Sequence, residues 1–539
     1  MVEMSAKGFK VCNFFWYICT NICVYTKDYM KSLKFILLAA CAVLCFGACS
    51  KSDDYSMEFS ANGLYFQWGG QSQTISYTTI NAASVTLKSA TTGWTCTIDE
   101  AAHTITITPP VEPETESAKD EQRQGDMVIT LTSKQGSEKT SLYTIKCYIV
   151  GDEIIMLNAG GEDANCYVIT EPMEAYSLDV SRNGGGQPIS GVNDVIIVWQ
   201  SYYGVIEHLV YDSEKKLATF YVDALTEEDD DDVYVKEDGK FVVPGANAVI
   251  AAVDSSDNVL WSWHLWFVKE SDNPLNNYST YANGVTFMNI NLGAFTNSNG
   301  ATDSTSAILD SYGLYYQWGR KDPFLRPFYH DCSGGESEYV FGESGTYYID
   351  LSFEERSSSN GTIEYSIAHP MAFITNASCV DADNGDGVGD WLYNANNNLW
   401  SNTSKSLYDP CPYGWKVPAA SDFDCLSLTA AEDQTALDTA RNRYGWMLSD
   451  GVNNYFYLGA GFRSYYDGAI HNMNYKEGVY PSQPEPWEGY YWTAGTTKDG
   501  KQSTCMYFDL TTTRTINKFN LNYPSKRANA MQIRCVKVK

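Results

Sequence analysis

Short runs in which apolar and polar residues alternate fill the chain from residue 56 onward. A period of two is typical of strands that bury one face, because successive side chains point to opposite sides. Between residues 56 and 150 such runs are separated by turn residues; they lie at 63–68, 73–77, 84–87, 94–98, 104–108, 127–131 and 142–149. This pattern predicts an immunoglobulin-like β-sandwich over residues 56–150, with a long polar surface loop at 109–125.

The next stretch, residues 151–271, continues in the same style and predicts a second β-sandwich. Its strands are expected at 165–169, 195–199, 218–222, 246–252 and 259–268. The last of these runs does not keep a clean alternation, which indicates either a bulge or burial on both faces. The acidic residues at 227–232 predict a solvated loop or hairpin tip, with a calcium site as the alternative.

Prolines and a glycine constrain residues 406–418 strongly. Pro410 and Pro412 fix φ and bias the residues before them toward extended geometry, which excludes a helix here. Gly414 permits a tight turn, and the alternation that follows it predicts a short strand. A helix capped by Ser421 is expected after the strand. This segment therefore predicts a rigid turn–strand–helix corner rather than a catalytic loop.

Residues 409–418, Asp-Pro-Cys-Pro-Tyr-Gly-Trp-Lys-Val-Pro, resemble the signature of a domain common in surface lipoproteins of Bacteroidetes. That domain is related to the Fibrobacter succinogenes major paralogous domain and has a C-type-lectin-like fold. Further phrases of the same family occur in the expected order, at 289–294, 313–324, 363–370, 389–391, 399–400, 491–493 and 532–536. The resemblance implies an α+β C-type-lectin-like domain over residues 275–539. It implies a fold far more than a function, because one fold hosts many functions.

Residues 30–49 have the three parts of a secretory signal. A basic start with Lys31 and Lys34 precedes an apolar stretch, and a site of small residues ends in Cys49. The apolar stretch is too short and wrongly flanked to span a membrane. The segment resembles a bacterial lipoprotein signal, which implies that Cys49 is acylated and becomes the mature N-terminus. Cys41 fits the cleavage motif better in its letters but leaves a shorter apolar stretch, so Cys49 is preferred.

The flanking segments complete this organisation. Residues 1–29 fit no targeting pattern and are interpreted as lying upstream of the true start, Met30. Residues 50–55 form a linker whose acidic character resembles an export signal for the outer cell surface. The expected location is therefore the outer membrane, at the cell surface, through a lipid anchor. The expected fold is mainly β: two immunoglobulin-like β-sandwich domains, a linker at 272–276, and the α+β C-type-lectin-like domain.

The charge balance narrows the choice of partners. The chain has 37 basic and 66 acidic residues, for a formal net charge of −29. A surface this acidic repels phosphate groups, which argues against nucleic acid and anionic membrane surfaces as ligands. The simplest interpretation is a charge that keeps the exported protein soluble.

The cysteines that follow the signal are interpreted in the light of export, because an oxidising compartment permits disulfides. Cys411 and Cys535 are expected to pair, since they bracket the signature segment and the terminal strand. Closing a loop of this length would stabilise the domain by roughly 4–5 kcal/mol on the chain-entropy model. Cys96 and Cys147 either pair or remain free thiols, and Cys166 is expected to be a small core residue.

Support for catalysis is thin. The six histidines are spread over all three domains, and neither a nucleophile elbow nor a Cys/His signature accompanies them. His264 and His369 are expected to be structural. Formylglycine-generating enzymes share the lectin-like fold, but their basic–Leu–Pro–Thr–Glu phrase has only a poor copy at 416–420, and their closely spaced cysteine pair is missing. The chain is therefore predicted not to be an enzyme.

Two segments offer ligand-binding chemistry. Asp381, Asp383, Asp386 and Asp390 lie among glycines within ten residues and could present oxygens to Ca²⁺; an acidic turn is the alternative. Their spacing departs from the EF-hand loop. Trp487 could stack on a sugar, with packing inside its own loop as the alternative. No other cofactor is expected.

These observations favour a non-enzymatic lipoprotein of the cell surface. The expected role is that of an adhesin or a fimbria-associated protein that binds or displays an extracellular partner. The alternative is a surface glycan-binding protein of a polysaccharide-uptake system, and an enzyme of unknown type comes third. The expected partners are an extracellular protein or glycan and, through the lipid anchor, the outer membrane; nucleic acid is not expected.

Overall fold

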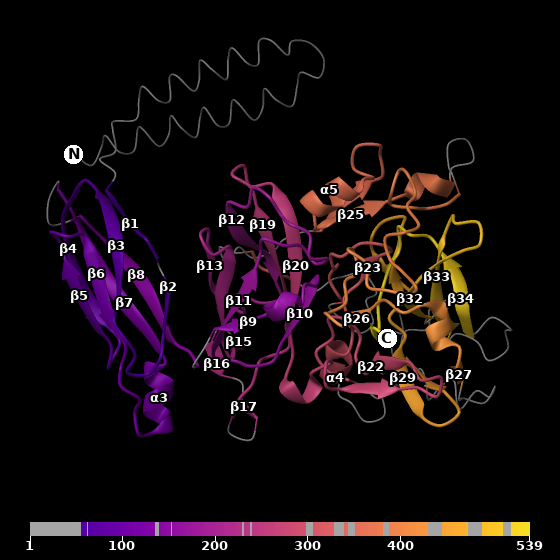
Figure 1. Ribbon diagram of the computed structural model, residues 1–539, viewed down its shortest axis with the longest axis horizontal. Helices are drawn as coiled ribbons and strands as arrows, with labels where there is room; N and C mark the ends of the chain where they lie inside the picture. Colours follow the sequence, from indigo (N-terminus) through magenta and orange to yellow (C-terminus); the bar gives the residue numbers. More distant parts are fainter. Residues whose placement is uncertain are drawn as a thin grey trace, which may run out of the picture.

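The structure is a computed structural model of the 539-residue chain. It describes residues 55–61, 63–134, 139–151, 154–228, 231–234, 236–237, 240–297, 305–327, 339–342, 351–380, 387–428, 445–472, 488–509 and 519–539. These residues form a mainly β protein, as the sequence predicted, in which groups of sheets follow one another along the longest axis (Figure 1). Within these ranges, no helix is long and apolar enough to cross a membrane.

The first group of sheets is a sandwich built from two sheets of four strands. The strands are β1 (Ser56–Phe59), β2 (Gly63–Phe66), β3 (Gln73–Ile80), β4 (Ala82–Ala90), β5 (Thr95–Asp99), β6 (Thr104–Thr108), β7 (Gln124–Ser133) and β8 (Thr140–Ile149). The sheets have the orders β1-β3-β6-β5 and β2-β8-β7-β4, and they enclose one apolar core. Buried and less buried residues alternate along β6 and β7, which is the pattern that predicted the sandwich.

One element of this sandwich departs from the prediction. The sequence predicts a surface loop at 109–125, but the structure places helix α3 (Glu116–Gln122) there. Thr115 begins the helix, because its side-chain oxygen accepts a hydrogen bond from the Ala118 amide at 3.3 Å. The polar composition concealed a short helix whose start was marked only by this capping residue.

The second group is also a sandwich. Its strands are β9 (Ile155–Met156), β10 (Cys166–Ile169), β11 (Glu174–Asp179), β12 (Asp194–Gln200), β13 (Glu207–Asp212), β14 (Leu217–Val222), β19 (Ala246–Val253) and β20 (Val259–Phe267). They form sheets in the orders β10-β20-β19-β12 and β13-β14-β11-β9. Two hairpins lie between β14 and β19: β15 (Leu225–Glu228) with β16 (Asp231–Tyr234), and β17 (Lys236–Glu237) with β18 (Lys240–Phe241). The described residues of the acidic run, 227–228 and 231–232, thus belong to paired strands of a hairpin, one of the two forms expected for the run.

Strand β20 has both features that were offered to explain its irregular pattern, a bulge and burial on both faces. Residues 261–267 are all buried, and the pairing with β19 shifts register at Ala252 and Val253. Trp263 and Leu265 pack into the core of the second sandwich, whereas Trp266 packs into a different core that the C-terminal residues build. A strand covered on both faces has no polar side, so its sequence cannot alternate.

The C-terminal region consists of many short elements. They are β21 (Tyr278–Thr280), β22 (Thr286–Met288), α4 (Thr305–Asp310), β23 (Tyr316–Gln317), β24 (Ser352–Glu355), α5 (Ile363–Ala368), β25 (Ala372–Thr375), β26 (Trp415–Lys416), β27 (Ser427–Leu428), β28 (Gly445–Ser449), β29 (Asn454–Leu458), β30 (Phe462–Arg463), β31 (Ile470–His471), β32 (Glu488–Thr496), β33 (Ser503–Asp509), β34 (Phe519–Ser525), β35 (Ala530–Met531) and β36 (Val536–Lys537). Single turns of 3-10 helix occur at η1 (Ala159–Gly161), η2 (Glu270–Asp272), η3 (Ala377–Val380) and η4 (Ala420–Phe423). Short helices among small sheets fit an α+β description, while the lectin-like topology stays a prediction.

The second sandwich and the C-terminal region share one continuous apolar core. Trp199 and Trp266 of the sandwich pack in the same cluster as Leu292 and Trp318 of the C-terminal region. The Trp266 indole also donates a hydrogen bond to the Ala294 carbonyl at 2.7 Å. The segment 272–276, predicted as a linker, therefore joins two parts of a common core rather than separating two independent ones.

A smaller joint connects the first sandwich to the second. Tyr148 of β8 is fully buried against Tyr221 of β14, with ring centroids 4.3 Å apart. Its hydroxyl donates to the Glu207 carboxylate at 2.6 Å, and the Tyr65 hydroxyl donates to the His208 carbonyl at 3.0 Å. Aromatic packing and partly buried hydrogen bonds thus fix the first sandwich against the second.

Candidate binding pocket beside the signature corner

The signature segment folds into a corner that is tied to the last strand. We call residues 409–423 the signature corner. The structure joins Cys411 to Cys535 in a disulfide, the pair predicted from the sequence, and both residues are fully buried. Next to the disulfide, β26 pairs antiparallel with β36, with Lys416 opposite Val536. A covalent bond and a β-pairing therefore hold the corner at the same place.

A buried carboxylate fixes the corner from inside. Asp409 is fully buried, and its oxygens accept hydrogen bonds from the amides of Cys411 and Val417, each at 2.9 Å. The Lys405 ammonium neutralises it at 2.9 Å. Gly414 has a φ of +75°, which permits the tight turn predicted here. The corner is thus rigid for reasons of covalent bonding, hydrogen bonding and charge.

The prediction of a helix capped by Ser421 is wrong. The structure has only the single turn η4, and the chain enters β27 a few residues later. Ser421 does not cap a helix; instead the Asp422 carboxylate accepts a hydrogen bond from the Ala419 amide at 2.7 Å and closes the turn. The apolar residues that suggested a longer helix, Phe423 and Leu426, are buried in a separate small core.

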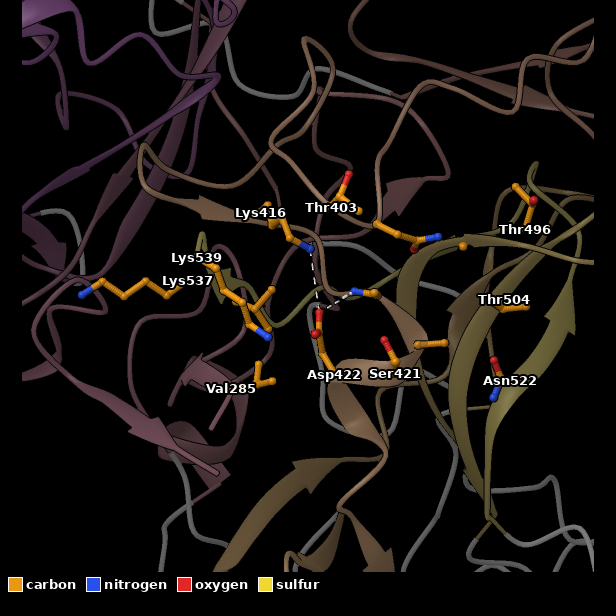
Figure 2. A pocket seen from close by; sticks show the side chains of 15 residues that line it. Val285, Thr403, Lys416, Ser421, Asp422, Thr496, Thr504, Asn522, Lys537 and Lys539 are labelled. Carbon is orange, nitrogen blue, oxygen red and sulfur yellow. Dashed lines mark hydrogen bonds and ion pairs between the residues drawn. The ribbon is translucent and has the colours of Figure 1, made fainter. Parts of the chain in front are cut away.

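A polar pocket of about 490 Å³ opens beside the signature corner (Figure 2). Its walls come from the corner, the sheet β32-β33-β34, strand β36 and the loop at 402–403, which are brought together only by the fold. The lining residues are Val285, Asn402, Thr403, Lys416, Ala419, Ala420, Ser421, Asp422, Gly495, Thr496, Thr504, Asn522, Val536, Lys537 and Lys539. Most of these side chains are small or carry a hydroxyl, an amide or a charge.

Lys416 is the most buried cation of this pocket, with 7% of its side chain exposed. Its ammonium donates a hydrogen bond to the Val417 carbonyl at 3.1 Å and lies 3.8 Å from an oxygen of Asp422. Burial lowers the pKa of Lys416, and the nearby carboxylates of Asp422 and Asp409 oppose that shift. Figure 2 shows the Lys416 and Asp422 side chains pointing toward each other across the pocket.

The two other lysines of the pocket differ in their surroundings. The Lys537 ammonium lies over the aromatic rings of Tyr278 and Trp415, at 4.8 and 5.8 Å from their centroids. This contact holds its charge against the rings. Lys539 is exposed, and its positive charge contributes to the lowered pKa of Lys416.

A second pocket of about 520 Å³ lies between β21 and β29, with Arg534 in its wall. The Arg534 guanidinium donates to the Asn291 side chain at 3.0 Å and to the Phe456 carbonyl at 2.9 Å. It also lies 4.0 Å from the centroid of the Tyr457 ring. These contacts make Arg534 a brace between strands, so the pocket beside the signature corner is the better candidate for binding.

The charged residues of the phrase at 313–324 also serve the fold. The ammonium of Lys321, which is 2% exposed, contacts the Asp322 carboxylate at 2.6 Å and donates to the Ser262 carbonyl at 3.1 Å. Arg320 donates to the carbonyls of Ala372 at 2.6 Å and Ser366 at 3.3 Å. Sequence reasoning placed this phrase in the C-terminal domain but missed its contact with β20, because nothing local marks a residue 59 positions away.

Of the predicted site residues, the structure describes only part. Cys49, Asp381, Asp383, Asp386 and Trp487 lie outside the described residues, so the lipid anchor and the sugar contact remain predictions.

Asp390, the fourth residue of the proposed calcium set, pairs with Arg527 at 3.0 Å, and both are buried. Burial raises the pKa of Asp390, and the Arg527 charge opposes the shift. Within the described ranges, no group of three or more His, Cys, Asp or Glu side chains could hold a metal ion. The calcium site stays a prediction, with Asp390 already engaged in an ion pair.

The histidines that were expected to be structural have structural partners. His264 is 2% exposed, and its Nε2 lies 2.8 Å from the Asn247 side-chain oxygen. His369 ends helix α5, where its backbone amide donates to the Tyr365 carbonyl at 2.9 Å. Cys166 is a buried free thiol in the shared core, as predicted.

The sandwich cysteines Cys96 and Cys147 are also free, so the alternative of a disulfide between them is not realised.

Comparison with known proteins does not assign the chain to a family. No family model and no curated protein matches it. Among solved structures, the human desmocollin-1 ectodomain shares 10% identity with a TM-score of 0.14, over 40% of this chain and 40% of that one. An endo-fucoidan hydrolase of glycoside hydrolase family 107 shares 13% identity with a TM-score of 0.14, over 39% and 34%. The mixed-linkage glucan-binding protein SGBP-B of Bacteroides ovatus shares 9% identity with a TM-score of 0.11, over 40% and 48%.

The chain therefore covers less than half the length of each of these structures. TM-scores at this level establish neither a shared topology nor a shared function.

Proposed function

We propose that this chain is a non-enzymatic binding protein of the outer cell surface, anchored through lipidated Cys49, which takes its ligand in the pocket beside the signature corner. The proposal rests on the volume, the lining and the fixed position of this pocket. It offers about 490 Å³ of polar-lined space on a corner that a disulfide, a β-pairing and a buried carboxylate hold in place. A preformed polar pocket suits selective binding, because little conformational freedom is lost when the ligand enters.

The way the two sandwiches and the C-terminal region pack together supports a protein that presents this pocket away from the cell, as an adhesin or a fimbria-associated subunit does. The shared core makes the second sandwich and the C-terminal region one packed unit, and the joint around Tyr148 fixes the first sandwich to it. Figure 1 shows the first sandwich and the C-terminal region at opposite ends of the molecule. A lipid at Cys49 would thus hold the chain at the end remote from the pocket. The phrases at 289–536 support assigning residues 275–539 to the C-type-lectin-like family of surface lipoprotein domains.

A second candidate function is that of a surface glycan-binding protein in a polysaccharide-uptake system. The lining of the pocket favours it, because hydroxyl and amide side chains both donate and accept hydrogen bonds, as sugar hydroxyls do. Asn402, Thr403, Ser421 and Asn522 supply such groups from three separate segments. Recognition through several short hydrogen bonds is what a saccharide requires.

A matched pair of substitutions tests the proposed site in the full chain purified in detergent. Ala420→Trp places an indole in the pocket, whereas Val452→Trp places one at a position that is 77% exposed and outside the pocket. We expect saturable binding to an extracellular protein or glycan in wild type and in Val452→Trp, and its loss in Ala420→Trp at an unchanged melting temperature. Equal binding by all three proteins would show that the ligand sits elsewhere.

Two further measurements test the remaining parts of the proposal. Labelled palmitate should enter the wild-type chain and not Cys49→Ala, and antibodies should label intact cells only in the wild type. Multivalent binding to a host or partner protein favours the adhesin, whereas saturable binding to one class of polysaccharide favours the glycan-binding candidate. Turnover of a sugar or peptide substrate by the pure protein would contradict the non-enzymatic proposal.

A further inference from the structure

The pocket beside the signature corner is positively charged on a chain whose formal net charge is −29. Lys416, Lys537 and Lys539 line it, and Asp422 is the only acidic residue among the lining residues that the structure describes. The Lys537 charge lies over the rings of Tyr278 and Trp415, and the ammonium groups of all three lysines add to the local potential. A local excess of positive charge in an acidic protein attracts an anionic group to that place.

The buried ammonium of Lys416 has hydrogen-bonding capacity that the fold does not fill. A lysine ammonium has three donors, and the Val417 carbonyl accepts one hydrogen bond at 3.1 Å. The Asp422 oxygen is 3.8 Å away, beyond the range of a hydrogen bond. Lys321 shows what a structural lysine looks like in this protein: its ammonium lies 2.6 Å from the Asp322 carboxylate and 3.1 Å from a carbonyl. Lys416 is almost as buried but more loosely paired.

Asp422 pairs with Lys416 but does not reach hydrogen-bonding distance of its ammonium. Its Oδ2 accepts a hydrogen bond from the Ala419 amide at 2.7 Å, so its position is set by the turn η4. The same oxygen is the one nearest to Lys416, at 3.8 Å. The carboxylate therefore orients the ammonium at a distance, and an incoming oxygen could approach the ammonium more closely than Asp422 does.

We infer that this pocket recognises an acidic saccharide, with the Lys416 ammonium bound to its anionic substituent and nearby hydroxyl and amide groups bound to its ring hydroxyls. Thr403, Ser421 and Asn522 offer those groups in the lining of the pocket, with Asn522 on the β34 side away from the ammonium (Figure 2). The anionic substituent is a carboxylate or a sulfate, because either presents oxygens to an ammonium. The inference rests on the proposed binding function and adds the chemical class of the ligand.

The test compares three substitutions in the full chain on a glycan array with uronate, sulfated and neutral members. Lys416→Met removes the charge but keeps an unbranched side chain, and Lys416→Arg keeps the charge. Lys215→Met removes an equal charge from a lysine that is 73% exposed and lies outside the pocket. Trigalacturonate and its methyl ester are then titrated by calorimetry, because esterification removes the charge of each carboxyl group and adds only a methyl group; a sulfated galactan oligosaccharide tests the sulfate.

We expect wild type and Lys215→Met to bind acidic members, and Lys416→Met to bind them about ten- to a hundredfold more weakly, as the loss of a charge-assisted hydrogen bond predicts. Lys416→Arg should retain most of the affinity, and added salt should weaken wild-type binding. Preference for trigalacturonate or for the sulfated oligosaccharide identifies the substituent.

Three outcomes would overturn the inference. Equal binding of charged and neutral members, or equal binding by wild type and Lys416→Met, would leave the pocket as a binding site without anion recognition. An array without any hit would also overturn it, while saturable binding of a protein ligand, blocked by Ala420→Trp, would still support the proposed function. Wild-type and Lys416→Met melting temperatures are measured alongside, so that a folding defect is not mistaken for loss of affinity.

Discussion

The disulfide between Cys411 and Cys535 allows the sharpest prediction about stability. It closes a loop of 124 residues, which on the chain-entropy model lowers the free energy of the folded state relative to the unfolded state by about 4–5 kcal/mol. Both cysteines are fully buried, so the double variant Cys411→Ala/Cys535→Ala avoids placing polar hydroxyls in the core. Because the second sandwich and the C-terminal region share a core, the loss should appear in the unfolding of both together.

We expect the double variant to lose about 4–5 kcal/mol of unfolding free energy in guanidinium titrations followed by tryptophan fluorescence. The melting temperature should fall by about 5–6 °C for a unit of this size. Cys166→Ala is the control, because it removes one sulfur from the same core without opening a loop; its cost should be about 1–2 kcal/mol. A double variant that loses no more than twice the control value would refute the argument from loop closure.

Three further predictions concern buried polar contacts. Burial lowers the pKa of His264 to about 3, from 6.5, so the unfolded chain binds an extra proton between these values; the contribution of this residue to stability is complete above pH 6.5 and is lost as the pH falls toward 3. His264→Gln should therefore flatten the acid side of a stability-against-pH curve, and an unchanged curve would contradict this assignment. Gly184→Ala should cost about 1–3 kcal/mol, because the added methyl group meets Asn165, whose amide holds two carbonyls of the C-terminal region; an unchanged melting temperature would show that this contact can yield. Asp390→Asn should cost about 3–5 kcal/mol in urea unfolding, because it leaves the Arg527 charge buried without its partner, and a neutral result would return Asp390 to the calcium hypothesis.

Local patterns predicted local structure well where burial was one-sided. Strand β7 alternates because one face meets the core of the first sandwich, and its alternation was visible in the sequence. Strand β20 did not alternate because the C-terminal region covers its second face, and only the fold shows what covers it. Helix α3 was missed because its residues are polar on most sides and its short length leaves no periodic signal. The helix expected after the signature corner failed because Asp422 closes a single turn instead.

A comparison of Lys321 with Lys416 shows what the sequence alone does not predict. Lys321 and Lys416 both lie in phrases that resemble the lipoprotein domain signature, and nothing in their neighbours distinguishes them. The fold places Lys321 against Ser262 and Asp322, where it braces two parts of the core. It places Lys416 at a pocket whose other walls come from residues near 285, 402, 495, 522 and 536. A pocket of this kind is a property of long-range packing.

The sequence by itself determined that the chain is mainly β, that its signature segment forms a rigid turn and strand, and that Cys411 pairs with Cys535. The first two features depend on the period of burial and on the fixed φ of proline, which are local, and the third depends on where the cysteines stand relative to the signature segment and the terminal strand. Only the tertiary structure decided that the second sandwich and the C-terminal region share a core and that a cationic pocket opens beside the corner. Both depend on which distant surfaces meet, and the free energy of those contacts is summed over the whole fold rather than over any single stretch of the chain.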